Sequence, residues 1–245
     1  MKAIIVGANG RMGQVLTELW QQTDPTDELI GVNRAELSDL METMAKADVL
    51  VDFSGPTALP AILAFGRRTR TPLVIATTGY SPDALETISQ TATAVPVFYS
   101  ANFSVGVYVL AELSKLAAQL LGETADIEII EKHHNRKKDA PSGTADLLAN
   151  ALETVRAEAG RAYGRHGLSP RVPGEIGIHS VRGGTIVGEH TVLFAMADET
   201  LEVTHRGESR RLFAAGALKA AKYMKDRQPG LYGMADLMNR RGSNE

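Results

Sequence analysis

Short runs of apolar, β-branched residues alternate with longer segments of helical periodicity through the first hundred residues of the chain. The clearest helical pattern covers 11–22, where apolar residues recur on one face (Met12, Val15, Leu16, Leu19 and Trp20). The alternation predicts strands over 3–6, 28–32, 48–53, 73–77 and 95–100, and further helices over 58–68 and 83–91. This order predicts an α/β fold with an N-terminal doubly wound, Rossmann-type parallel sheet.

The pattern changes after Asn102 and predicts a second domain of α+β architecture with a mixed sheet. Helices are expected over 105–121 and 141–160, an alternating strand over 126–134 and a loop over 161–175. Strands follow over 176–181, 185–196 and 200–206; Gly183-Gly184 indicates a hairpin, and 197–199 a second tight turn. A last helix is expected over 209–225. We expect a first domain over 1–103, rejoined by 213–245, and a second over 104–212.

Composition narrows the classes of partner. The chain has 245 residues, a net charge of -3 and no cysteine. No strong overall field would attract nucleic acid or a membrane surface, and disulfides and thiolate metal sites are excluded. The apolar run over 3–6 is too short for a signal sequence, and we expect no stretch that approaches the ~20 apolar residues of a membrane span. The sequence therefore predicts a cytoplasmic protein without nucleic-acid or membrane partners.

A glycine-rich turn joins the first predicted strand to the first predicted helix. It contains Gly7, Ala8, Asn9, Gly10, Arg11, Met12 and Gly13. Gly7 and Gly10 permit a tight turn and close approach of a ligand, Gly13 permits close packing, and the helix start presents free N–H groups to a pyrophosphate. The spacing is GxxGxxG and not the commoner GxGxxG. The context favours a dinucleotide site over a turn without a ligand.

Cofactor choice depends on the residues that follow the second predicted strand. A carboxylate there would bind the ribose hydroxyls of NAD, but the chain has Asn33 and Arg34. Arg34 is suited to a 2′-phosphate, although a surface arginine in a loop is the alternative. We expect use of both NADPH and NADH, with NADPH preferred.

The segment 126–145 (DIEIIEKHHNRKKDAPSGTA) carries the richest chemistry. Asp139 or Ala140 is expected to cap a helix that has Pro141 at its first position. The N–H groups and hydroxyls of the first turn then form an anion pocket from Ser142, Gly143 and Thr144. Positive charge gathers just before it in His133, His134, Arg136, Lys137 and Lys138. This arrangement fits a small polycarboxylate.

Other interpretations of the segment remain. His133 and His134 could be a metal pair, but neighbours on a strand point to opposite faces and no third ligand is suggested, so we expect no metal. The cations over 136–138 could be a solvated run, and Ser-Gly-Thr could serve only the helix start.

The segment EKHHNRKKDAPSGTA resembles the signature of the dihydrodipicolinate reductase family, E-x-H-H-x-x-K-x-D-A-P-S-G-T-A. Further similar motifs occur in order over essentially the whole chain: GANGRMG, VDFSGP (51–56), ATTGY (76–80), SANFSVGV (100–107) and VRGGTIVGEHTV (181–192). The resemblance implies reduction of a cyclic imine dicarboxylate, formed from pyruvate and aspartate semialdehyde, by NADH or NADPH in lysine and diaminopimelate biosynthesis. The chain departs from the family pattern at three positions. Many members have an acidic residue where this chain has Asn33. Ala76 and Ser100, both small, stand where Gly and Ala are commoner.

The resemblance also implies roles for individual residues. His133 would be the proton donor and Lys137 the second catalytic residue. His134, Gly143 and Thr144 would hold the substrate, with Ser142 nearby. The cofactor would be lined by Gly7, Ala8, Asn9, Gly10, Arg11, Met12, Ala76, Thr77, Thr78, Ser100, Ala101, Asn102 and Phe103. The second domain would bind substrate and form a homotetramer through its sheet.

Two alternatives stay open at this point. The chain could be another two-domain NAD(P)-dependent dehydrogenase. The intact segment 133–144 argues against this alternative. It could instead be a non-catalytic dinucleotide-sensing protein, which would need neither His133 nor Lys137.

Overall fold

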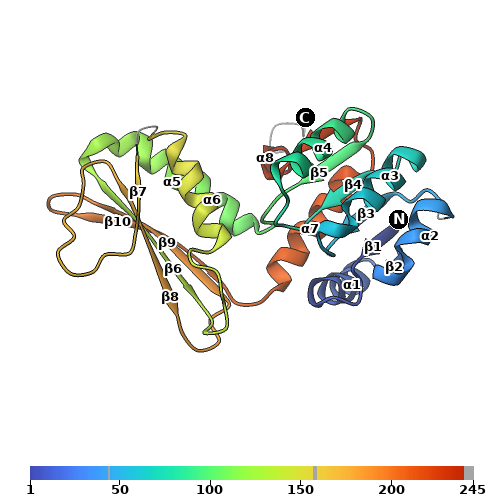
Figure 1. The fold of residues 1–245 in the computed structure, drawn as a ribbon, viewed down its shortest axis with the longest axis horizontal. Helices are drawn as coiled ribbons and strands as arrows, with labels where there is room; N and C mark the ends of the chain where they lie inside the picture. The colour runs from blue at the N-terminus through green and yellow to red at the C-terminus, as the bar shows by residue number, and fades with distance from the viewer. Residues whose placement is uncertain (44, 157–158, 240–245) are drawn as a thin grey trace. The chain divides into compact units, whose positions relative to one another are not determined.

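The computed structural model describes residues 1–43, 45–156 and 159–239, without the side chains of residues 34, 40 and 41. The chain divides into two compact units, Met1–Ser104 with Arg210–Glu245 and Val105–Ser209. Each unit has its own sheet (Figure 1). Each also has its own apolar core.

The first unit contains a six-stranded sheet in the order β11-β5-β4-β3-β1-β2. Its strands are β1 (Lys2–Val6), β2 (Glu28–Val32), β3 (Val49–Asp52), β4 (Leu73–Ile75), β5 (Pro96–Tyr99) and β11 (Gly230–Tyr232). Every pair of neighbours is parallel, so the predicted Rossmann-type sheet is confirmed. The edge strand β11 lies in the tail, where the sequence pattern predicted no strand.

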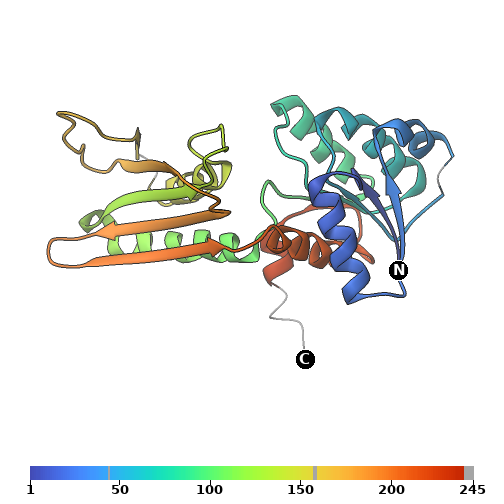
Figure 2. The same cartoon turned by 90° about the horizontal axis from the view of Figure 1, so that it is seen from below.

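Helices pack on both faces of this sheet. They are α1 (Arg11–Thr23), α2 (Leu37–Glu42), α3 (Leu59–Thr69), α4 (Pro82–Ala92), α7 (Arg211–Met224) and α8 (Met234–Met238), with 3-10 turns η1 (Arg34–Glu36) and η2 (Pro56–Ala58). Ile62 and Phe65 of α3 and Ile88 of α4 join Ile4 and Val6 of β1 in one core. Helices α1 and α7 pack against each other, as Figure 2 shows, and α7 also packs on β3, β4 and β5. The first unit is therefore doubly wound.

The second unit contains a five-stranded sheet in the order β10-β9-β6-β8-β7. Its strands are β6 (Asp126–His133), β7 (Arg161–Tyr163), β8 (Ile176–Arg182), β9 (Gly188–Ala195) and β10 (Thr200–Gly207). β6 is parallel to β8 and antiparallel to β9, so the predicted mixed sheet is confirmed. Helices α5 (Val105–Leu121) and α6 (Gly143–Glu153) pack together and bury the apolar face of the sheet, and η3 (Gly122–Thr124) follows α5.

The predicted hairpin at Gly183-Gly184 is wrong. These glycines do connect β8 to β9, but the two strands do not pair with each other, because β6 lies between them. A local turn signal cannot reveal a third strand that enters from elsewhere in the sequence. The turn over 197–199 does join the antiparallel pair β9 and β10, with the Met196 N–H bonded to the Glu199 carbonyl.

Two boundaries of the predicted helix over 141–160 are also wrong. Helix α6 begins at Gly143, with Ser142 as its N-cap, so Pro141 precedes the helix and does not occupy its first position. The Ser142 hydroxyl accepts the Ala145 N–H, which is ordinary capping chemistry. Helix α6 ends at Glu153, and the predicted loop over 161–175 begins with the short edge strand β7.

One expectation about membranes needs correction. The segment Val105–Thr124 is long and apolar enough to cross a bilayer by length and composition. A single such helix is weak support for a membrane span, because core helices of globular units pass the same test. In the second unit Leu110, Ala111 and Ala118 of α5 lie in the apolar core.

Candidate active site

The predicted cofactor residues lie at one edge of the first unit's sheet. The strands are parallel, so their carboxyl ends meet at this edge. Gly7 follows β1, Asn33 follows β2, Ala76 follows β4 and Ser100 follows β5. β2 and β3 lie on opposite sides of β1, so the glycine turn occupies the point where strand order reverses. Open α/β sheets bind their ligands at such a point.

The glycine turn leaves no room for a side chain at Gly7 or Gly13. A Cβ on Gly7, whose φ is +83°, would lie 2.7 Å from the carbonyl oxygen of Phe53, and a Cβ on Gly13 would lie 2.2 Å from the carbonyl oxygen of Gly7. Gly10 is the N-cap of α1 and makes no side-chain capping bond. The first N–H groups of α1 precede the first intrahelical bond, from Gln14 to Gly10, so they suit a pyrophosphate. The turn therefore fits a dinucleotide.

A cavity of about 400 Å³ adjoins this turn, within the range of small-molecule sites. Gly7, Gly10, Asn33 and Leu37 are among its lining residues. The Asn33 side chain accepts the Asn9 N–H at 2.9 Å, while the Glu36 carboxylate accepts the Asn33 backbone N–H at 2.7 Å. Glu36 is thus an acidic group in this turn that the sequence reasoning missed. The side chain of Arg34 lies outside the described part of the chain.

A buried carboxylate supports the loops at the same edge. Asp52, at the end of β3, is fully buried and accepts hydrogen bonds from Ser54 Oγ at 2.5 Å and Tyr80 Oη at 3.3 Å. Burial raises the pKa of Asp52, against the opposing effect of the Ser54 hydrogen bonds. Asp52 ties the loop after β3 to the loop after β4, which carries Ala76, Thr77 and Thr78. The sequence signal for this supporting role was an acidic residue, Asp52, at the end of an apolar strand in the motif VDFSGP.

The predicted residues after β5 differ in character. Ala101 is exposed, Ser100 and Asn102 are half-buried, and Phe103 is buried. The Phe103 ring packs near Phe53 and Phe98. Phe103 is therefore a core residue that shapes the edge, whereas the other three are accessible.

In the second unit, β6 brings acid and imidazole onto its buried face. Residues 127, 129, 131 and 133 alternate with exposed or half-buried neighbours, so Glu131 and His133 extend the face formed by Ile127 and Ile129. Strand register places Arg182 of β8 opposite His133 and His190 of β9 opposite Glu131. The apolar face therefore ends in a polar cluster at the carboxyl end of β6.

Glu131 is the centre of this cluster. His133 Nδ1 lies 2.5 Å from Glu131 Oε2, and Arg182 donates to both carboxylate oxygens, from Nη1 at 2.8 Å and from Nη2 at 2.7 Å. The Ser142 N–H donates to Oε1 at 3.1 Å. Burial raises the pKa of Glu131, but hydrogen bonds from Arg182, Ser180 and His133 outweigh it and lower the pKa to about 2. The carboxylate is therefore ionised at neutral pH.

The two buried histidines of the cluster, His133 and His190, both have a lowered pKa. Burial lowers the pKa of His133, opposed by Glu131 and assisted by the positive charges of Lys137 and Arg182. Burial lowers the pKa of His190 to about 3. The rings meet edge to face with centroids 5.1 Å apart, and His190 Nε2 lies 3.0 Å from the Ser142 hydroxyl. Burial therefore favours the neutral form of both imidazoles in the free protein.

The remaining predicted substrate residues surround the start of α6. Lys137 is half-buried, with Nζ 2.7 Å from Asp139 Oδ2. His134 Nδ1 is buried without a hydrogen-bond partner among the described residues. Ser142 is buried and engaged within the protein, whereas Gly143 is exposed and Thr144 half-buried. Arg136 and Lys138 are exposed. Over residues 1–43, 45–156 and 159–239, no cluster of acidic or histidine side chains has the arrangement of a metal site.

Comparison with known proteins decides the family. The family model for the N-terminus of dihydrodipicolinate reductase matches residues 1–103, and the model for its C-terminus matches residues 106–238. The chain belongs to the dihydrodipicolinate reductase family. The resemblance inferred from the sequence motifs is thereby confirmed, and the chain is an NAD(P)H-dependent oxidoreductase of this family.

Relatives of this reductase match it over nearly their whole length. The 4-hydroxy-tetrahydrodipicolinate reductase of Caldanaerobacter subterraneus subsp. tengcongensis is 45% identical over 249 residues, which cover 98% of this chain and 99% of the relative. The enzyme of the same name from Akkermansia muciniphila is 42% identical over 239 residues, 96% of each chain. The solved structure of dipicolinate-bound dihydrodipicolinate reductase from Paenisporosarcina sp. TG-14 has a TM-score of 0.76 at 21% identity, covering 97% of this chain and 99% of that one. At this identity, the last likeness shows a shared fold.

The reductase fold thus brings most of the predicted residues together within each unit. The glycine turn, Asn33, Ala76 and Ser100 share one sheet edge, and His133 lies within one polar cluster with Ser142. Sequence reasoning did not assign roles to Glu131, Arg182 or His190. All three fall within motifs that carried the resemblance, and Glu131 was visible as a charged residue on an otherwise apolar strand face.

Proposed function

We propose that this chain reduces 4-hydroxy-tetrahydrodipicolinate to tetrahydrodipicolinate with NAD(P)H and with loss of the ring hydroxyl as water, as a step of lysine and diaminopimelate biosynthesis. The observation that carries the proposal is the segment 131–144, where a buried imidazole, a lysine and a helix start converge in one reductase-family domain. These groups suit an electron-rich ring that must gain a proton and whose carboxylates must be held.

His133 is the proposed proton donor. Its Nδ1 faces Glu131, so the proton that it donates resides on Nε2. The pKa of His133 lies below its ordinary value in the free protein, and the negative charge of a bound dicarboxylate would raise it. Protonation of His133 is thus coupled to the arrival of the substrate. The nicotinamide, when bound, supplies the hydride.

Lys137 and the start of α6 are proposed to hold the substrate. The ammonium of Lys137 stabilises negative charge, and the N–H groups of Gly143 and Thr144 belong to the helix turn that favours anions. His134 adds a buried ring nitrogen that needs a partner. Ser142 has a structural role in this pocket, because its N–H donates to Glu131 and its hydroxyl accepts the Ala145 N–H.

The proposed cofactor site is the glycine turn with the loops after β2, β4 and β5, and we propose that NADPH is preferred over NADH. The neutral amide of Asn33 cannot repel a 2′-phosphate, and Arg34 supplies a planar cation. Glu36 opposes this preference through its negative charge, but its carboxylate is engaged with the backbone and side-chain amides of Asn33. Both dinucleotides therefore remain substrates.

The wider assignments follow the family. The first unit is the proposed dinucleotide-binding domain and the second the proposed substrate-binding and oligomerisation domain. We propose a homotetramer formed through the second unit's sheet, acting in the cytoplasm without nucleic-acid or membrane partners. Light scattering of the purified protein tests the tetramer.

The function is tested by an assay with freshly generated 4-hydroxy-tetrahydrodipicolinate and either NADPH or NADH. Oxidation of the dinucleotide that depends on the ring substrate supports the proposal. Binding of dinucleotide without turnover would instead favour a sensing protein. Turnover only with other carbonyl or imine substrates would favour a different two-domain dehydrogenase.

A further inference from the structure

The carboxylate of Glu131 joins three parts of the second unit. Its side chain is fully buried and contacts β8 through Arg182, the α6 start through Ser142, and its own strand through His133. Burying a charge is costly unless it is paired and bonded, so this arrangement is specific to an ionised carboxylate. Arg182 completes the pairing with a bidentate contact.

An ionised Glu131 determines which ring nitrogen of His133 carries the proton. A carboxylate only accepts, so the His133 nitrogen at 2.5 Å from Oε2 must be Nδ1–H. The other nitrogen, Nε2, is then the one that gains and loses a proton. A carboxylate behind an imidazole also stabilises the imidazolium that precedes proton donation.

Gly188 leaves space at the Nε2 edge of the ring. A Cβ added to Gly188 on β9 would lie 3.1 Å from His133 Nε2 and 3.4 Å from its Cδ2.

The charged or titratable groups facing this ring are Glu131 of β6, Arg182 of β8, His190 of β9 and Lys137 of the following loop. Glu131 alone among these favours the protonated ring; Lys137 and Arg182 disfavour it.

We propose that Glu131 is the positioning residue of His133: it fixes the Nδ1–H tautomer, directs Nε2 toward the substrate, and favours the imidazolium, while Arg182 holds Glu131 ionised. This inference rests on the proposed function, in which His133 donates the proton. Glu131 does not touch the substrate and acts only through His133.

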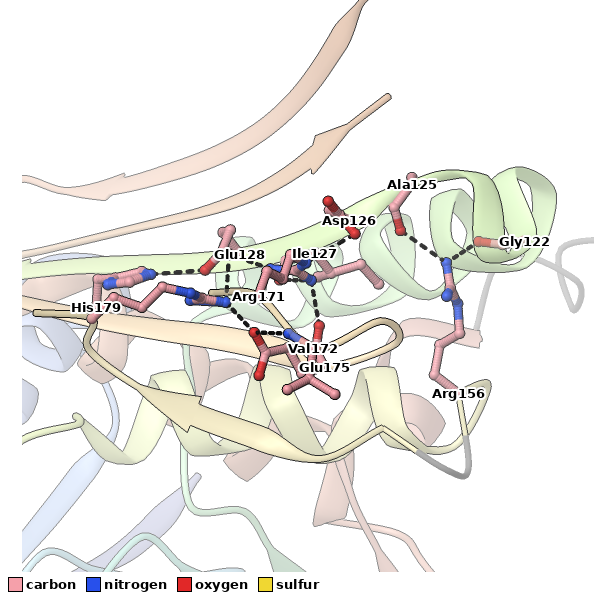
Figure 3. Close-up of polar contacts among 11 residues, drawn as sticks. Gly122, Ala125, Asp126, Ile127, Glu128, Arg156, Arg171, Val172, Glu175 and His179 are labelled. Atoms are coloured by element: carbon pink, nitrogen blue, oxygen red, sulfur yellow. Dashed lines mark hydrogen bonds and ion pairs between the residues drawn. The ribbon is translucent and has the colours of Figure 1, made fainter. Parts of the chain in front are cut away.

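Glu128 provides a matched control on the same strand. It lies three residues before Glu131 and faces the opposite side of β6, where it contacts Arg165 and, as Figure 3 shows, Arg171 and His179. Glu128→Gln therefore disturbs an ionic cluster of similar richness without touching His133. Glu131→Gln keeps the size and one acceptor of the side chain but removes the charge.

The test compares kcat and KM of both variants across pH, with freshly generated substrate. We expect Glu131→Gln to lower kcat by roughly 10- to 100-fold and to move the loss of kcat with rising pH to a lower pH, because the imidazolium loses its carboxylate partner. KM should change less than threefold. Glu128→Gln should keep kcat within about twofold and leave the profile in place.

A second measurement uses the unmodified protein, so its result does not depend on whether the Glu131→Gln variant folds. Nitrogen-15 chemical shifts of the His133 ring in the unmodified protein at neutral pH should show Nδ1 protonated and Nε2 unprotonated. An Nε2–H tautomer would overturn the proposal, as would a Glu131→Gln enzyme that loses activity equally at every pH without moving the profile. Absence of turnover in the unmodified protein would instead contradict the proposed function, and the ring shifts would still decide the tautomer.

Discussion

The Nδ1 atom of His133 lies 2.5 Å from Oε2 of Glu131, and the two residues are separated by a single residue on β6. Alternate residues of a strand face the same side, so this contact follows directly from the strand geometry. Arg182 and Ser142 occupy the remaining acceptor positions of the carboxylate. The polar cluster at the carboxyl end of β6 is thus built from one strand, its neighbour and the start of one helix.

The catalytic roles proposed for His133 and Lys137 predict large losses of kcat on substitution. His133→Gln and Lys137→Ala should each lower kcat by at least about 100-fold, the usual weight of general-acid and electrostatic groups. Steady-state kinetics with both dinucleotides measures this. Lys138→Ala, which removes the exposed neighbouring ammonium, should stay within about twofold of the unmodified enzyme. Near-normal turnover in the first two variants would remove both residues from the chemistry.

The anion pocket proposed at the start of α6 predicts inhibition by a dicarboxylate. Pyridine-2,6-dicarboxylate, a planar mimic of the ring, should compete with the substrate. Thr144→Val should raise the inhibition constant several-fold, because it removes a hydroxyl from the first turn. Thr154→Val, at the C-cap of the same helix, is the matched control and should have no effect. Equal weakening by both variants would place the inhibitor elsewhere.

The turn after β2 predicts opposite effects of two substitutions on cofactor choice. Arg34→Ala should raise KM for NADPH about tenfold, or ~1.4 kcal/mol, and leave NADH nearly unchanged, because only NADPH carries the 2′-phosphate. Glu36→Gln keeps an acceptor for the Asn33 N–H but removes the negative charge, so it should lower KM for NADPH. A native preference for NADH, or equal losses with both dinucleotides in Arg34→Ala, would contradict the assignment.

His190 predicts a fall in stability on the acid side. Its pKa is lowered to about 3 in the folded protein, while an unfolded histidine titrates near 6.5. Between these values the unfolded chain binds a proton that folded His190 does not, so the free energy of unfolding decreases as pH falls from about 6.5 toward 3. The slope from this one group is at most about 1.4 kcal/mol per pH unit.

Denaturant unfolding between pH 7 and pH 4 tests the contribution of His190. His190→Gln should be less stable than the unmodified protein at pH 7, where it loses packing, but its stability should decrease less steeply with acid. His166→Gln is the control in the loop after β7. Parallel curves for His190→Gln and the unmodified protein would show that His190 is not the responsible group.

The sequence predicted helices, strands and turns well where the pattern that specifies each one lies within its own adjacent residues. The turn after Val6 and the alternation over 126–134 each depend on adjacent residues, and both appear as predicted. The hairpin at Gly183-Gly184 failed because β6, about fifty residues earlier, enters between β8 and β9. The edge strands β7 and β11 have three residues each, too few for a periodic signal.

The candidate site shows the same limit. His133, Lys137 and the start of α6 lie within one segment, so their chemistry could be inferred together from the sequence. The Glu131–Arg182 contact joins residues 51 positions apart, and only strand pairing brings them together. The contact of Glu36 with Asn33 is different, because Asn33 followed three residues later by Glu36 has the spacing of a capping box, so it could have been predicted from the sequence.

Transfer of an isotopic label tests the proposed reduction most directly. NADPH carrying deuterium at the reactive C4 position would be mixed with freshly generated 4-hydroxy-tetrahydrodipicolinate and the purified protein, and the product analysed by mass spectrometry. We expect one deuterium in tetrahydrodipicolinate from one of the two C4-labelled forms of NADPH, and at most about a hundredth of that rate with His133→Gln. Tight dinucleotide binding without label in the product, from either labelled form, would contradict a reductase acting on this ring.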